Sequence, residues 1–69
     1  MAVASVSTIT AGSPVGWQDA LSLGVARAQK TLRHITGVRV LEERARVEDG
    51  KIVEYLVTMQ VIFLLENPE

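Results

Sequence analysis

The sequence contains no cysteine and very few aromatic residues. Its 69 residues include one Trp, one Tyr and one Phe. The lack of cysteine excludes disulfide bonds and thiolate metal sites. A chain this short usually needs disulfides, a metal or association with other chains to be stable. We therefore expect a single domain, residues 1–69, that is stabilised mainly by oligomerisation, with a bound ion as a second contribution.

The chain also has no large excess of positive or negative charge and no long apolar run. Seven Lys and Arg residues oppose eight Asp and Glu residues, for a net charge of -1. Nothing resembles the basic patch of a nucleic-acid-binding protein. No run approaches the roughly 20 apolar residues that span a bilayer, and residues 1–10 lack the charged and apolar parts of a signal peptide. We expect a cytoplasmic protein with neither nucleic-acid nor membrane partners.

Catalytic motifs are missing as well. His34 is the single histidine and is expected to close a helix, where a cation favours the helix dipole. Without a second His or a Cys, no transition-metal site can form. Gly12 and Gly16 lack the spacing and the Lys of a phosphate-binding loop, and no serine stands in a nucleophile-elbow motif. The sequence predicts a protein that is not an enzyme.

The hydrophobic pattern predicts an α+β fold with the order strand, helix, strand, strand. The expected bounds are 3–10, 15–34, 38–48 and 52–65. Ser13 is expected to cap the helix and Pro14 to occupy its first position. Gly24, in the middle of the helix, predicts the close approach of another backbone. Apolar residues recur at helical spacing: Trp17, Ala20, Leu21, Gly24, Val25, Ala28, Leu32 and Ile35.

The last two strands are predicted to form a hairpin. Asp49-Gly50 is a dipeptide that tolerates the positive backbone angles of a tight turn. In the last strand the odd positions are apolar throughout, whereas the even positions are mixed but include Leu56, Ile62 and Leu64. One helix can cover one face of a three-stranded antiparallel sheet. The other face is therefore predicted to be a contact surface.

Three short motifs, in their order and spacing, resemble the dodecin family over residues 6–66. They are Ala11-Gly12-Ser13, the helical residues 26–32, and Glu54-Tyr55-x-Val57 followed by Val61-Ile62-Phe63. The resemblance implies a sheet wrapped around one helix and assembly into a hollow dodecamer. It also implies flavins stacked between aromatic side chains of neighbouring subunits and bound by a glutamine.

The two positions whose side chains contact the flavin ring in that family carry different residues in this chain. The aromatic residue corresponds to Gly37 and the glutamine to Leu56, which supply neither a ring nor an amide. Flavin is therefore not expected as a cofactor, and the chain resembles most a calcium-binding branch of the family. Trp17 is not expected to replace the lost ring, because its helical spacing predicts packing in the core or in an interface.

The resemblance implies calcium sites built from acidic residues. Calcium takes six to eight oxygen ligands, and symmetry-related copies can multiply one carboxylate. Glu42 corresponds to an acidic position near a three-fold axis in some relatives, and Glu48 with Asp49 is the acidic pair of the hairpin tip. An alternative remains open, in which these carboxylates are solvated and pair with basic neighbours: Arg44, Arg46 or Lys51.

Three functions follow from these observations. The first is a homododecameric binding or storage protein for divalent cations, calcium above all. The second is a flavin-buffering dodecin that uses a different pocket. The third is a small interaction subunit of a larger complex, which would leave the second sheet face free for its partner.

Overall fold

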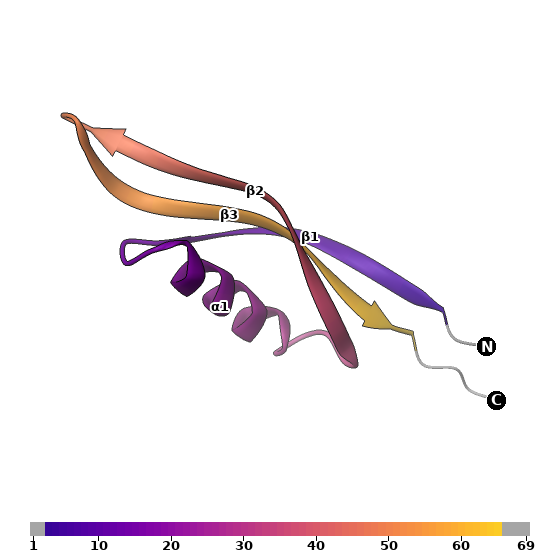
Figure 1. The fold of residues 1–69 in the computed structure, drawn as a ribbon. Helices are drawn as coiled ribbons and strands as arrows, with labels where there is room; N and C mark the ends of the chain where they lie inside the picture. Colours follow the sequence, from indigo (N-terminus) through magenta and orange to yellow (C-terminus); the bar gives the residue numbers. More distant parts are fainter. Residues whose placement is uncertain (1–2, 66–69) are drawn as a thin grey trace.

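Three strands and one helix follow one another in the predicted order. The computed structural model describes residues 3–65, with β1 (Ala4–Ser13), α1 (Trp17–Ala28), β2 (Ile35–Glu48) and β3 (Lys51–Leu64). Both strand pairings are antiparallel, and β3 lies between β1 and β2. Helix α1 lies along one face of this sheet and packs on β1 and β3 (Figure 1). The predicted α+β fold is confirmed.

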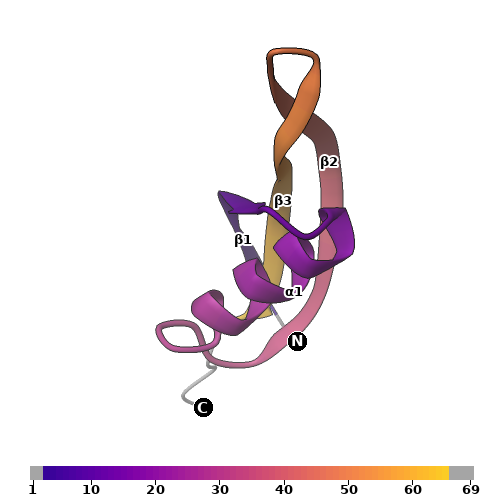
Figure 2. The ribbon, with the colours of Figure 1, turned by 90° about the vertical axis from the view of Figure 1, so that its left-hand side faces the viewer.

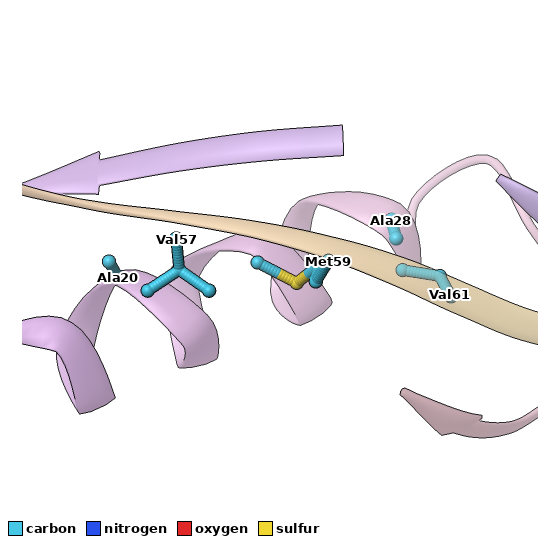
Figure 3. Packing of buried hydrophobic residues seen from close by; sticks show 5 residues of the cluster. All are labelled: Ala20, Ala28, Val57, Met59 and Val61. Atoms are coloured by element: carbon cyan, nitrogen blue, oxygen red, sulfur yellow. The ribbon is translucent and has the colours of Figure 1, made fainter. Parts of the chain in front are cut away.

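The core lies between α1 and the odd positions of β3. Val57, Met59 and Val61 are each at most 1% exposed, and they point toward Ala20 and Ala28 of the helix (Figure 3). In a strand, side chains alternate between the two faces, so the even positions of β3 lie on the face away from α1. No helix within residues 3–65 combines the length and the apolar character needed to cross a membrane.

Gly24 provides room for a side chain of the sheet. A Cβ atom at this position would lie 2.6 Å from Cε of Met59 and 3.2 Å from Cβ of Ala11. The prediction that another backbone approaches Gly24 was therefore wrong. Because Gly24 has no side chain, the side chain of Met59 occupies the space that a Cβ atom at position 24 would need.

The helix begins later than predicted, at Trp17 with Gly16 as its N-cap. Ser13 instead ends β1, where its hydroxyl accepts a hydrogen bond from the Val15 N–H at 2.9 Å. The same hydroxyl donates to Oδ2 of Asp19 at 2.6 Å. Ser13 thus holds the turn before the helix, so its predicted role as helix cap and the predicted helical place of Pro14 were wrong.

The helix also ends earlier than predicted, at Ala28. The Leu32 N–H still bonds to the Ala28 carbonyl, but the chain then turns away. His34 has a φ of 62°, a left-handed conformation that no α-helix contains. Its predicted place as the last helical residue was therefore wrong. Leu32 and Ile35 nevertheless pack against the core, which explains why the helical apolar pattern continued past the real helix end.

The sheet differs from the predicted strands in β1 and β2, and β2 begins at Ile35, three residues before the predicted start. The predicted strand stops at residue 10, but β1 continues through Ser13, which pairs with Tyr55 of β3. The predicted hairpin turn is confirmed, because Asp49 and Gly50 have φ values of 52° and 74°. Beyond Tyr55 the sheet therefore has two strands only. We call residues 45–54 the arm, which projects past the start of α1 (Figure 2).

Candidate ligand-binding face of the sheet

The face of the sheet turned away from α1 is not covered by any helix in residues 3–65. We call it the outer face. It carries the even positions of β3 together with the residues that pair with them, because directly opposed residues share a face. From β1 through β3 to β2, its rows are Val6–Ile62–Gly37, Thr8–Gln60–Arg39, Thr10–Thr58–Glu42 and Gly12–Leu56–Arg44.

An irregularity in β2 decides which side chains reach this face. The register shifts between Val40 and Glu42, so that Leu41 is the extra residue. One extra residue in a strand reverses the faces of all residues that follow it. Arg39 lies on the outer face before the shift and Glu42 after it. Periodicity alone could not have predicted this placement of Glu42 beside Thr58.

Gly37 and Leu56 both lie on the outer face, far apart. Gly37 pairs with Ile62, and a Cβ atom at Gly37 would have one neighbour within 4 Å, Cδ1 of Ile62 at 3.9 Å. Leu56 pairs with Gly12 and Arg44. Because Ile62 and Leu56 are six residues apart on one strand, about 20 Å separates the two positions. A single planar ligand contacts both only if they come from different copies of the chain.

The predicted metal ligands also lie apart within one chain. Glu42 lies in the middle of β2, and Oε2 of Glu42 is 3.4 Å from Nε of Arg44. Glu48 lies at the tip of the arm, where its Oε2 is 2.5 Å from Nη1 of Arg46, and Asp49 follows in the turn. Within residues 3–65, no three His, Asp or Glu side chains come together as a metal site would require. A shared site therefore needs carboxylates from several copies.

Glu54 is a charged residue of this face that the sequence identified only as part of a family motif and not as a candidate site residue. Its Oε1 accepts a hydrogen bond from Nε of Arg46 at 3.1 Å, and this bond is the main reason that the pKa of Arg46 is raised above its usual value. Its other oxygen, Oε2, would be 2.5 Å from a Cβ atom at Gly12. Counting back from the Asp49-Gly50 turn would have placed Glu54 opposite Ala45, because the extra residue Val53, which pairs Glu54 with Arg46 instead, has no signal in the sequence.

Comparisons with known proteins point to one family. The Dodecin family model matches residues 3–66. The chain is 39% identical over 55 residues to Dodecin of Thermus thermophilus, which is 80% of each chain. It is 35% identical to Dodecin from Streptomyces davaonensis, with a TM-score of 0.90 and coverage of 96% of this chain and 97% of the relative. The calcium-chelating antigen calcium dodecin of Mycobacterium tuberculosis is 31% identical, with a TM-score of 0.80 and coverage of 97% and 96%.

Proposed function

The chain belongs to the dodecin family, and we propose that it is a cytoplasmic, single-domain subunit, residues 1–69, of a dodecameric binding or storage protein. In this proposal the particle binds divalent cations, calcium above all, has little affinity for flavin and catalyses no reaction. The observation that carries the proposal is the chemistry of the two positions that correspond to the flavin-contacting residues of the family. Gly37 and Leu56 offer neither a ring nor an amide on the outer face.

The loss of these two groups weakens flavin binding strongly. Stacking of a planar ring on an aromatic side chain contributes about 1–3 kcal/mol. A polar ring edge that faces Leu56 instead of an amide loses a hydrogen bond, at a cost of about 1–3 kcal/mol. At 1.4 kcal/mol for each factor of ten, the combined loss of about 2–6 kcal/mol weakens binding by roughly one and a half to four orders of magnitude.

The shape of the chain supports assembly. Its radius of gyration is 14.4 Å, whereas a compact chain of this length has about 11 Å. Large apolar side chains that are 36–58% exposed occur on β2 and in the arm: Val38, Val40, Leu41, Val47 and Ile52. Contact with other copies would remove this surface from water, at about 25 cal/mol for each Å² of apolar area.

A calcium site built by several copies fits the position of Glu42. In the middle of β2, Glu42 pairs with Thr58 on the outer face, whereas the adjacent Glu43 pairs with Val57 on the opposite face, so one chain offers a single carboxylate there. Calcium needs six to eight oxygen ligands, which three or more copies around an axis can provide together with water. The Mycobacterium tuberculosis relative, which chelates calcium, supports this choice of ion. Arg44 competes for the same carboxylate and would have to yield when the ion binds.

Native mass spectrometry and calorimetry test the proposal. The assembled protein is treated with a chelator, dialysed and titrated with calcium, and the mass of the particle is measured on the same sample. We expect about twelve chains and heat from calcium binding that Glu42→Gln abolishes. Glu48→Gln tests the tip pair in the same way. A particle that gives no calcium heat, or equal heat in wild type and both variants, contradicts the metal assignment.

A further inference from the structure

The arm begins where β1 and α1 no longer contact strands β2 and β3. The last pair between β1 and β3 is Ser13 with Tyr55, and α1 begins at Trp17. Beyond this point residues 45–54 form a two-stranded ribbon with no helix over either face (Figure 2). Two-stranded ribbons twist strongly and are marginally stable in water. The direction of the arm therefore depends on what contacts its base.

Trp17 makes that contact with both strands of the arm's base. Its Nε1–H donates a hydrogen bond to the carbonyl oxygen of Arg44 in β2 at 2.9 Å. Its ring lies 4.9 Å from the ring of Tyr55 in β3, at 80°, an edge-to-face arrangement. Aromatic pairs of this geometry add stability beyond the area that they bury. Only 36% of Trp17 is exposed, so its own chain already covers most of the residue.

We propose that Trp17 is a latch that sets the direction of the arm relative to the helix and the three-stranded sheet. The side chain suits this role because it combines a fixed hydrogen-bond donor with a large flat surface. The donor holds β2 through its backbone, and the surface holds β3 through Tyr55. Phenylalanine would keep part of the surface and lose the donor, whereas leucine would lose both the donor and the ring.

The latch has a consequence that rests on the proposed assembly. A closed symmetric particle requires every copy to present its contact surfaces in the same relative orientation. An arm that is already fixed in the single chain loses less conformational freedom on association. Trp17 then favours assembly without needing to touch a neighbouring copy.

Hydrogen exchange of the backbone amides measures the latch directly in the full chain. We expect Trp17→Phe to accelerate exchange of the arm amides, residues 45–54, about fivefold, since it removes one hydrogen bond. Trp17→Leu should accelerate them more. Exchange of the core amides of Val57 and Val61 should change little. Gln18→Ala, an exposed position on the same helical turn, is the control and should match wild type.

Three results would overturn the latch. The first is unchanged arm exchange in both Trp17 variants, and the second is equal acceleration across the core and the arm. The third is loss of the particle, by native mass spectrometry, with arm exchange unchanged, which would make Trp17 an interface residue. If the wild-type protein proves monomeric, the proposed assembly fails, but selective acceleration of the arm in the same exchange experiment still supports the latch.

Discussion

The body of the molecule, which is the helix with the three-stranded sheet, shares strands β2 and β3 with the arm, yet the two regions bury their apolar residues differently. In the body, Val57, Met59 and Val61 are covered by α1 and are fully buried. In the arm, Val47 and Ile52 are cross-strand partners and remain 58% and 49% exposed. Helix α1 packs on β3 in the body and does not extend over the arm, where β3 also has an extra residue, Val53, at a shift in the pairing register. The difference in burial therefore follows the extent of the helix.

The difference in burial separates two contributions to stability, one from packing within a single chain and one from association between chains. The body obtains its burial within one chain, so substitutions there should act at any protein concentration. The arm has apolar side chains that only a neighbouring molecule can cover, so substitutions there should act mainly through association. Experiments that distinguish these two kinds of effect test the proposed assembly without needing its structure.

The largest effect is expected in the body, for Met59→Ala. Met59 is fully buried and fills the space in front of Gly24. Removing its side chain should lower the free energy of unfolding by about 2–5 kcal/mol, because a cavity remains. Denaturant titration at a fixed protein concentration measures this change. Val47→Ala in the arm is the contrast, with a change below about 0.5 kcal/mol in dilute protein that grows as the concentration rises.

Substitution of Gly24 tests the contact between position 24 and Met59 independently. Gly24→Ala alone should be unfavourable, since the added methyl group would lie 2.6 Å from Cε of Met59. Combined with Met59→Ala, the same methyl group enters the cavity. The double variant should therefore be more stable than the sum of the single changes predicts. Additive changes would contradict the contact between these two residues.

The second effect concerns the outer face, through Gly37→Trp combined with Leu56→Gln. Gly37 can accept a side chain, because its φ is not positive and the nearest atom to a Cβ there is 3.9 Å away. We expect the double variant to bind riboflavin about 100-fold more tightly than wild type, measured as quenching of flavin fluorescence. Each single variant should gain less. No quenching in an assembled double variant would argue against the assignment of the flavin positions.

A smaller effect is expected at the turn before the helix, for Ser13→Ala. Ser13 is 1% exposed, and its hydroxyl group joins the Val15 N–H to the Asp19 carboxylate. Its loss leaves two polar groups without this partner and should cost about 1–2 kcal/mol of unfolding free energy. Thr10→Ala is the matched control, because it removes an exposed hydrogen bond to Thr58 and should cost less. Equal losses would mean that burial of Ser13 is unimportant.

The sequence predicted the fold, the turn and the buried face of β3, but not where the helix ends. Strand alternation and the Asp49-Gly50 pair are local signals, and both led to correct predictions. Leu32 and Ile35 misled the prediction of the helix because they contact the same core from a turn and from a strand. The spacing of apolar residues reports which residues face the core, and it does not report the backbone that carries them.

The residues of the candidate site were harder to predict from the sequence than the fold was, and Leu41 shows why. A single extra residue in β2 turns Glu42 to the outer face, and no composition or spacing rule identifies it. The ion pairs of Glu42 and Glu48 with Arg44 and Arg46 were foreseen as an alternative to metal binding, and both occur. Which carboxylates meet between copies depends on contacts outside the chain, so it stays a prediction.

The smallest effect is expected at the tip of the arm, for Asp49→Ala. Asp49 adopts a φ of 52°, and this left-handed conformation is unfavourable for a residue with a Cβ unless its side chain bonds locally. Alanine lacks that capacity, so the variant should lose about 0.5–1 kcal/mol of unfolding free energy, whereas Asp49→Asn should lose none. Denaturant titration of both variants gives the comparison. Equal losses in Asp49→Ala and Asp49→Asn would contradict a local role of the side chain in the turn. If Asp49→Asn keeps its stability but abolishes calcium binding, the carboxylate is also a ligand, and the tip belongs to the proposed metal site as well as to the turn.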